Sequence, residues 1–94
     1  MRLDTLVQTL MDNPKISVEL SSHTDQRGKD AYNLKLSQRR AESAVDYIVS
    51  KGIARTRITA RGYGETRPII AKPISEAEYQ RNRRTEFKVT RVAN

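Results

Sequence analysis

Residues 16–49, ISVELSSHTDQRGKDAYNLKLSQRRAESAVDYIV, contain the pattern that decides the fold of this 94-residue chain. At the start of the stretch, Ile16, Val18 and Leu20 alternate with polar residues. Such alternation is typical of a strand with one buried face. The segment 21–28 that follows is polar and rich in turn-forming residues. We therefore predict a half-buried strand that runs into a polar loop.

The second half of the stretch indicates a helix. Apolar residues recur at helical spacing between Ala41 and Val49, as expected for an amphipathic helix with one buried face. Ser37 suits the N-cap, because its hydroxyl can accept a hydrogen bond from a free N–H group of the first turn. Gly52 stands where a helix end favours glycine. The sequence predicts a short helical turn near residues 30–33 and a longer helix from about Ser37.

Patterns that predict further helices and strands occur before and after residues 16–49. Apolar spacing predicts a helix that starts near Leu3. The helix is expected to stop just before Pro14, because proline disfavours helical geometry in the preceding residue. A short strand is expected around Ile58, where apolar and polar residues again alternate. The glycine-containing segment 62–64 is predicted to break that strand.

The carboxyl-terminal third supplies one more helix and one more strand. Ser75 and Glu78 form the pattern of a capping box, which predicts a helix ending near Asn82 or Arg83. Alternation over residues 85–90 predicts the last strand. The order helix–strand–helix–strand–helix–strand predicts a two-layer α/β sandwich. We expect it to form a single domain over residues 1–94.

Composition limits what such a domain can do. The chain contains no cysteine, which excludes disulfides, a thiolate nucleophile and cysteine-based metal sites. No apolar run approaches the roughly 18 residues of a membrane span, and the first residues do not resemble a signal peptide. If the protein works outside the cytoplasm, we therefore expect this chain to be a piece of a longer protein.

The chain is strongly basic. Eighteen Lys and Arg residues against eleven Asp and Glu residues give a net charge of +7. That balance favours polyanionic partners, so a basic nucleic-acid-binding domain is the alternative function. With one Phe, four Tyr and no Trp, however, the chain is poorly supplied with aromatic side chains on which bases could stack. Charge alone selects no partner.

Catalytic chemistry finds little support. His23 is the only histidine, and it lies near Ser21, Ser22 and Asp25 where the first strand ends. Residues of these types form hydrolase triads, but neighbours on a strand point to opposite faces and nothing supplies an oxyanion hole. A single histidine without cysteine also makes a poor metal site. We expect no enzyme, no metal and no cofactor, and the simpler role for Asp25 is local backbone capping.

A series of motifs spans most of the chain: His23-Thr24-Asp25, Tyr32-Asn33, Arg40-Ala41, Gly62-Tyr63-Gly64-Glu65 and Asn82-Arg83-Arg84. In this order and spacing the series resembles the OmpA-like peptidoglycan-binding domain of outer-membrane proteins, peptidoglycan-associated lipoproteins and flagellar stator proteins. The similarity extends from about Ile16 to Val89. It implies a βαβαβ-type fold with a mixed sheet, non-covalent binding of the cell wall without nucleic acid, and a periplasmic location associated with the outer membrane.

The resemblance also implies the binding residues. In the family, the Asp of the His-Thr-Asp segment and the Arg before Ala on the next helix hold the diaminopimelate of the peptidoglycan stem peptide. Those positions here are Asp25 and Arg40. Thr24 belongs to the same segment and is expected at the ligand. Asn33 and Arg83 fall on two further positions that contact ligand in the family.

The chemistry of Asp25 and Arg40 suits this ligand. The free end of diaminopimelate carries an ammonium and a carboxylate on one carbon, and a carboxylate beside a guanidinium complements that zwitterion. Arginine can donate two parallel hydrogen bonds to the ligand carboxylate. If the helix begins near Ser37, Arg40 lies in its first turn, where free N–H groups and the helix dipole favour an anion.

The chain departs from the family at its start. The family begins with a strand before its first helix, whereas this chain begins directly with the helix. In the family that strand lies beside the last strand. We therefore expect an exposed sheet edge around Phe87 and predict self-association through it. Contact with a membrane is expected only through segments of the parent protein outside this chain.

Overall fold

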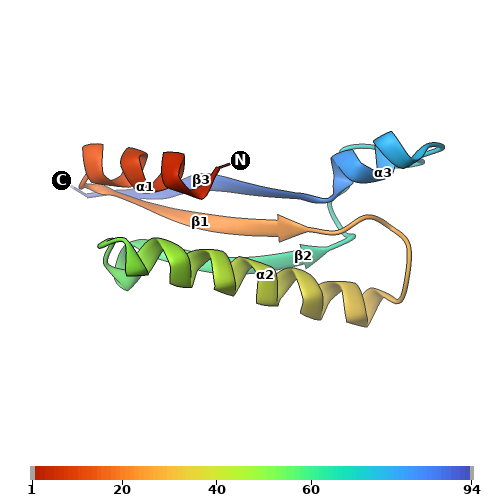
Figure 1. The fold of residues 1–94 in the computed structure, drawn as a ribbon, viewed down its shortest axis with the longest axis horizontal. Coiled ribbons are helices and arrows are strands. Elements are labelled where there is room, and N and C mark those ends of the chain that lie inside the picture. Colours follow the sequence, from red (N-terminus) through yellow and green to blue (C-terminus); the bar gives the residue numbers. More distant parts are fainter. Residues whose placement is uncertain (1, 94) are drawn as a thin grey trace.

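The computed structural model describes residues 2–93, and the helices and strands follow the predicted order (Figure 1). The elements are α1 (Leu3–Asp12), β1 (Ile16–His23), α2 (Asp30–Ser50), the 3-10 turn η1 (Arg55–Arg57), β2 (Ile58–Gly64), α3 (Glu76–Asn82) and β3 (Arg84–Val92). None of the helices within residues 2–93 is long and apolar enough to cross a membrane.

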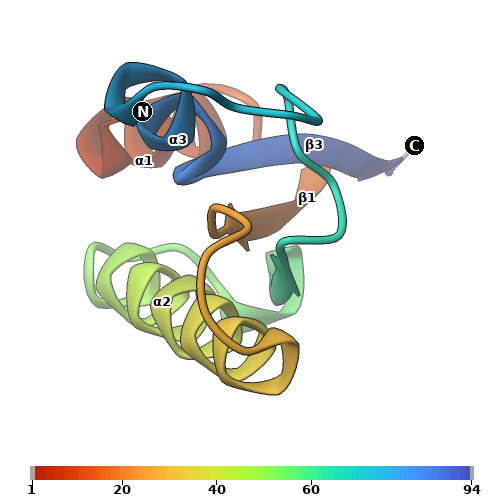
Figure 2. The same cartoon turned by 90° about the vertical axis from the view of Figure 1, so that its right-hand side faces the viewer.

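A mixed three-stranded sheet forms one layer of the molecule. Its strand order is β2-β1-β3, with β1 parallel to β2 and antiparallel to β3. Helix α2 provides the crossover that two parallel neighbours require. The view along the strands shows α1 and α2 together on one face of the sheet (Figure 2). The predicted two-layer α/β architecture is confirmed, and within the described residues no strand precedes α1.

The apolar core lies between the sheet and the two longer helices. The predicted alternation in β1 is confirmed, because Val18 and Leu20 are fully buried. The other members of the core cluster come from α1, α2, the segment after α2 and the first position of β2: Leu6, Val7, Leu10, Ala41, Val45, Ile48, Ile53 and Ile58. Burying each large aliphatic side chain stabilises the fold by about 1.5–3 kcal/mol. The core therefore holds the central part of α2 in a defined position.

Helix α2 begins at Asp30, so the prediction of a separate turn and an N-cap at Ser37 was wrong. Ser37 lies inside the helix and is fully buried. Its hydroxyl donates to the carbonyl of Leu34 at 2.9 Å and accepts from the N–H of Gly64 at 2.8 Å. The buried stripe continues towards the helix start through Ser37 and Asn33. Because these two buried residues are polar, the apolar spacing in the sequence ends at Ala41 and does not show that the helix begins at Asp30.

Strand β2 runs to Gly64, so the prediction that residues 62–64 break it was also wrong. The backbone of α2 lies directly on this end of the strand. A Cβ atom on Gly62 would lie 2.1 Å from the backbone nitrogen of Gln38 and 2.5 Å from the backbone carbonyl carbon of Ser37. The glycine is therefore required by the close approach of the helix rather than by a turn.

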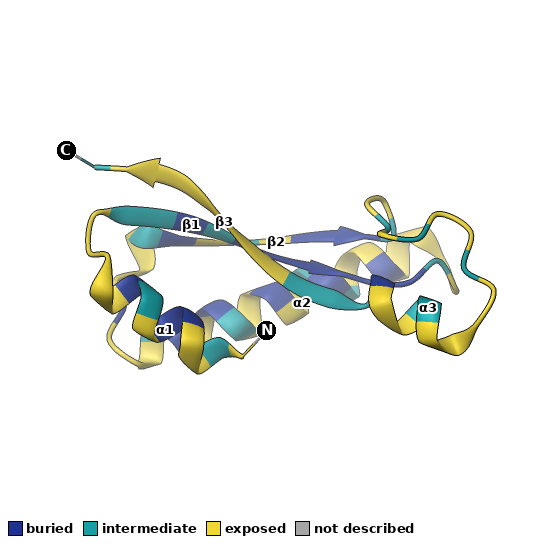
Figure 3. Cartoon of the chain, turned by 90° about the horizontal axis from the view of Figure 1, so that it is seen from above, coloured by how far each residue is buried: buried dark blue, intermediate teal, exposed yellow. Residues whose placement is uncertain are grey.

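Strand β3 forms an edge of the sheet. It pairs with β1 on one side and with no strand of the described residues on the other. Phe87 and Val89 remain 39% and 49% exposed, and most of the strand is coloured as exposed in Figure 3. The predicted exposed edge around Phe87 is confirmed.

The close packing of α2 on β2 gives a first testable prediction. Gly62→Ala should lower the free energy of unfolding by about 1–3 kcal/mol, because neither backbone can move away without disturbing the core. The exposed neighbour Thr59 provides the control, and Thr59→Ala should change it by less than about 0.5 kcal/mol. Urea unfolding measures both. Equal stability of Gly62→Ala and the wild type would contradict the contact.

Candidate functional site

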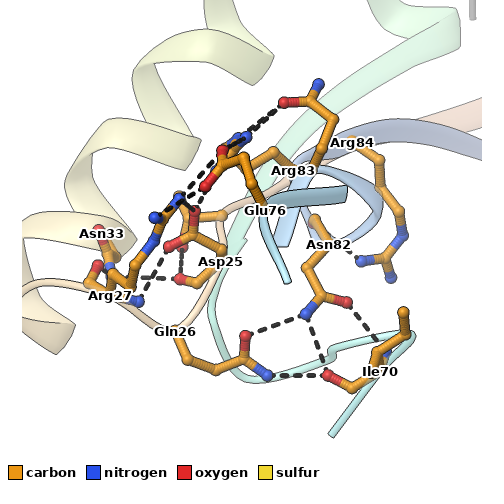
Figure 4. Close-up of polar contacts among 11 residues, drawn as sticks. Asp25, Gln26, Arg27, Asn33, Ile70, Glu76, Asn82, Arg83 and Arg84 are labelled. Carbon is orange, nitrogen blue, oxygen red and sulfur yellow. Dashed lines mark hydrogen bonds and ion pairs between the residues drawn. The ribbon is translucent and has the colours of Figure 1, made fainter. Parts of the chain in front are cut away.

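The candidate site lies at the end of the sheet where β1 and β2 finish and β3 begins (Figure 1). Three segments meet there: the loop after β1, helix α3, and the first residues of β3. The side chains of Asp25, Arg27, Glu76 and Arg83 converge between them (Figure 4). These four residues are called the Asp25 cluster.

Asp25 is the buried centre of this cluster, only 7% exposed. Its Oδ1 accepts the backbone N–H of Arg27 at 2.9 Å, and its Oδ2 accepts Nη2 of Arg27 at 3.0 Å. The same Oδ2 also accepts Nη1 of Arg83. The side chain of Arg27 is the main cause that lowers the pKa of Asp25 from 3.8 to about 2, against the opposing effect of burial. Both oxygens of an ionised carboxylate are therefore engaged.

Helix α3 contributes the outer part of the cluster. Its N-cap is Ser75, as predicted, and the Ser75 hydroxyl accepts the N–H of Glu78 at 3.2 Å. The other half of the predicted capping box differs, because the carboxylate of Glu78 accepts the backbone N–H of Ile74 at 3.2 Å and not that of Ser75. Glu76 binds Nη1 of Arg27 at 3.0 Å and Nη2 of Arg83 at 2.7 Å. These guanidinium groups, first that of Arg83 and then that of Arg27, lower the pKa of Glu76. Arg83 also donates to the side chain of Gln80.

Asn82 holds these segments together, a role that sequence reasoning missed. Its fully buried side chain accepts the backbone N–H groups of Ile69 and Ile70 at 2.9 Å each. It donates to the side chain of Gln26 and to the carbonyl of Ile70 at 3.0 Å each (Figure 4). The sequence marked Asn82 only as part of the Asn82-Arg83-Arg84 motif. No local pattern indicates what its side chain binds.

Thr24 and Asn33 use their side chains inside the loop. The hydroxyl of Thr24 donates to the carbonyl of Asp25 at 3.1 Å. The amide nitrogen of Asn33 donates to the carbonyl of Arg27 at 2.9 Å and to Oε1 of Glu65 at 3.4 Å. Both side chains are nearly buried. The structure therefore places them where they shape the backbone around Asp25.

Beside the cluster lies an open groove of about 450 Å³. Seven residues line it: Ser22, His23, Arg40, Gln80, Arg83, Arg84 and Thr85. Arg40 is exposed, and its side chain makes no ion pair or hydrogen bond within the described part of the chain. Arg83 connects the two features, since it lines the groove and also binds Asp25. The expected pair is thus brought to one region of the molecule, where Arg83 contacts Asp25 and lines the same groove as Arg40.

Arg40 lies well inside α2, because the helix begins at Asp30. The prediction that the N-terminus of this helix assists Arg40 in anion binding was therefore wrong. Free N–H groups and the favourable end of the dipole are confined to the first turn. The groove is instead lined by guanidinium groups, those of Arg83 and Arg84 beside Arg40.

His23 does not form a hydrolase triad. Its ring is buried and stacks on Tyr63 with centroids 5.3 Å apart. Nε2 lies 3.3 Å from Oγ of Ser21, but Nδ1 has no hydrogen-bond partner among residues 2–93. The carboxylate of Asp25, which a triad would place at Nδ1, binds arginines instead. The described residues also contain no group of three His, Asp or Glu side chains that could hold a metal ion.

The mixed sheet with helices on one face, and a polar site at its end, define a small α/β domain of a recognisable type. The chain belongs to the OmpA family, whose model matches residues 1–83. It is 48% identical over 84 residues to outer membrane porin F of Pseudomonas fluorescens. That match covers 89% of this chain but only 26% of the porin, so the chain corresponds to about a quarter of that relative.

Solved structures agree with this assignment. The peptidoglycan-associated lipoprotein of Burkholderia pseudomallei is 28% identical, with a TM-score of 0.85 over 94% of this chain and 74% of that one. The cell wall anchor of the T6SS from Pseudomonas aeruginosa is 32% identical, with a TM-score of 0.80 over 98% of this chain and 64% of that one. The predicted family and fold are confirmed. The names of these relatives describe proteins of the outer membrane and the cell wall, which confirms the predicted envelope location.

The low pKa of Asp25 predicts an acid-dependent stability. A carboxyl group with a pKa near 2 in the folded protein and about 3.8 in the unfolded chain stabilises the fold above pH 4. That contribution is lost as the pH falls from about 4 to about 2. Free energies of unfolding measured across this range should fall more steeply for the wild type than for Asp25→Asn.

Asp46 offers a matched control for this measurement. It pairs with Arg55 on the surface at 3.1 Å, far from the cluster in sequence, and both side chains are mostly exposed. Asp46→Asn should therefore keep the steep acid dependence of the wild type, since exposed pairs contribute little. The same slope in Asp25→Asn and the wild type would show that the cluster does not stabilise the ionised form.

Proposed function

We propose that this domain binds peptidoglycan non-covalently through the diaminopimelate of the stem peptide, and that it anchors a longer envelope protein to the cell wall. The observation that carries the proposal is the guanidinium group of Arg40, which has no partner among residues 2–93 and lines an open groove together with Arg83, a partner of the buried carboxylate of Asp25. The family of the chain supports it, as do relatives whose names describe a peptidoglycan-associated lipoprotein and a cell wall anchor.

Arg40 binds the ligand carboxylate in this proposal. Its planar guanidinium can donate two parallel hydrogen bonds, a geometry that lysine cannot supply. The neighbouring Arg83 and Arg84 raise the positive potential of the groove and favour an anion there. Asp25 receives the ammonium of the same amino-acid head. Its oxygens face arginine N–H groups, so the ammonium takes the place of one of these donors.

The remaining predicted residues act around this pair. Arg83 binds Asp25 and lines the groove, so it can contact ligand directly. Asn33 and Thr24 hold the loop backbone on either side of Asp25 and act as positioning residues. The domain binds without cleaving its ligand, and no cofactor takes part.

Affinity for one soluble stem peptide is expected to be modest. A charge-assisted hydrogen bond contributes about 1.5–3 kcal/mol when it is partly desolvated, and less when solvent screens it. Stable retention comes from the repetition of the ligand along the wall. A tether through the parent protein adds to it, because it raises the effective concentration of the domain.

Binding to purified sacculi tests the proposal. Arg40→Ala should weaken binding about 10- to 100-fold, because it removes the carboxylate contact. Asp25→Ala should also weaken binding, because it removes the partner of the ligand ammonium and frees the loop that Asp25 holds through Arg27 and Arg83. Free diaminopimelate should compete with the wild type. Co-sedimentation of the protein with sacculi measures all three.

Arg39 provides the matched control. It precedes Arg40 on the same helix, is exposed and does not line the groove. Arg39→Ala removes the same charge and should keep wild-type binding. If the two variants weaken equally, the basic chain adheres to the wall by charge alone and the proposed site is wrong.

We also propose that β3 associates with a second copy of this chain. Its outer edge is unpaired within the described residues, and Phe87 and Val89 add exposed apolar surface. Unpaired strand edges of this kind are templates for pairing with another strand.

Sedimentation at rising protein concentration tests this association. The wild type should show a concentration-dependent larger species, and Phe87→Lys should remove it, because a charge on an edge strand opposes pairing. Ile74 is also exposed but lies outside the sheet. Ile74→Lys should therefore leave the association unchanged. A strictly monomeric wild type would contradict the proposal.

A further inference from the structure

The carboxylate that would hold a ligand ammonium is already occupied. Both oxygens of Asp25 accept hydrogen bonds, and its side chain is only 10% exposed. A ligand can reach this carboxylate only if one of the two guanidinium groups leaves. The identity of the arginine that leaves determines which chemical groups the ligand must carry.

Arg27 is the arginine that can be replaced. Its side chain is 50% exposed, whereas that of Arg83 is 26% exposed and is also held by Glu76 and Gln80. Arg27 already contacts Glu76 at 3.0 Å, and its guanidinium lies 4.2 Å from the ring centroid of Tyr79. These two contacts can retain the guanidinium after it releases Asp25.

We infer that Arg27 determines ligand specificity: it occupies the position of the ligand ammonium at Asp25, so that only a ligand with a carboxylate beside its ammonium displaces it. This inference rests on the proposed function. Exchanging one cation for another at Asp25 replaces one charge-assisted hydrogen bond with a similar one. The exchange itself therefore supplies little net affinity.

The charges around the site explain the need for a carboxylate. Two carboxylates, those of Asp25 and Glu76, face the three guanidinium groups of Arg27, Arg40 and Arg83, so that one guanidinium group has no contacting carboxylate before any ligand binds. The nearby carboxylate of Glu65 contacts Asn33 and none of these arginines. A simple ammonium adds a second positive charge among these groups. A zwitterionic amino-acid head adds none, and its carboxylate gives Arg40 a partner. The self-occupied site therefore rejects a lone ammonium and admits an amino-acid head.

Two stem tripeptides isolate this difference. L-Ala-γ-D-Glu-meso-diaminopimelate and L-Ala-γ-D-Glu-L-lysine differ only by the carboxylate next to the terminal ammonium. Calorimetric titration of each peptide into the wild type and Arg27→Ala measures the selectivity ratio. The wild type should prefer the diaminopimelate peptide. Arg27→Ala should bind both peptides more tightly and the lysine peptide by the larger factor, so that the ratio falls at least several-fold.

Controls separate this effect from charge and from folding. Arg55→Ala removes the same charge at a surface pair with Asp46 and should keep the wild-type ratio. If Arg27→Ala does not fold, Arg27→Gln removes the charge while keeping a neutral donor near Asp25, and the same fall in the ratio is expected. An unchanged ratio, or weaker binding of both peptides, overturns the inference and leaves the proposed function standing. Absence of binding of the diaminopimelate peptide to the wild type rejects both.

Discussion

The buried carboxylate of Asp25 is the interaction on which the candidate site depends. It joins the loop after β1 to the end of α3 through Arg83, and it fixes the path of its own loop through Arg27. A buried charge is costly unless it is paired and hydrogen-bonded, so this geometry is strongly specified. Helix α3 has only seven residues and would not be stable alone. Its contact with Asp25, and the buried side chain of Asn82, hold it against the loop after β1 and the segment that contains Ile70.

The proposed binding depends on the guanidinium group of Arg40, which lines the groove and has no partner within residues 2–93. Arg27 and Arg83 are satisfied by Asp25 and Glu76, and Arg84 binds Glu86, but Arg40 faces the groove without a partner in the described part of the chain. A net charge of +7 therefore gives little information about binding. Ligand binding at the proposed site depends on which guanidinium group is free to accept a ligand and on which carboxylate lies near it.

Helix α2 extends from the core to the candidate site and positions Arg40 there. Its buried stripe is apolar where it faces the core, at Val45 and Ile48, and becomes polar at Ser37 and Asn33. The change has a physical cause, because this end of the helix covers backbone groups of β2 and the loop that need hydrogen-bond partners. The hydroxyl of Ser37 serves the N–H of Gly64 in this way. One continuous helix thus gives Arg40 a rigid position.

Local sequence determined the order of the elements, the cap at Ser75, the alternation in β1 and the motifs that indicate the family, because caps and periodicity act over a few residues. The start of α2 and the length of β2 depended on contacts between the helix and the strand, which no local pattern contains. The occupation of Asp25 was likewise decided only in three dimensions. Its partner Arg83 lies 58 residues away along the chain, and only the packing of α3 onto the loop brings the two charges into contact.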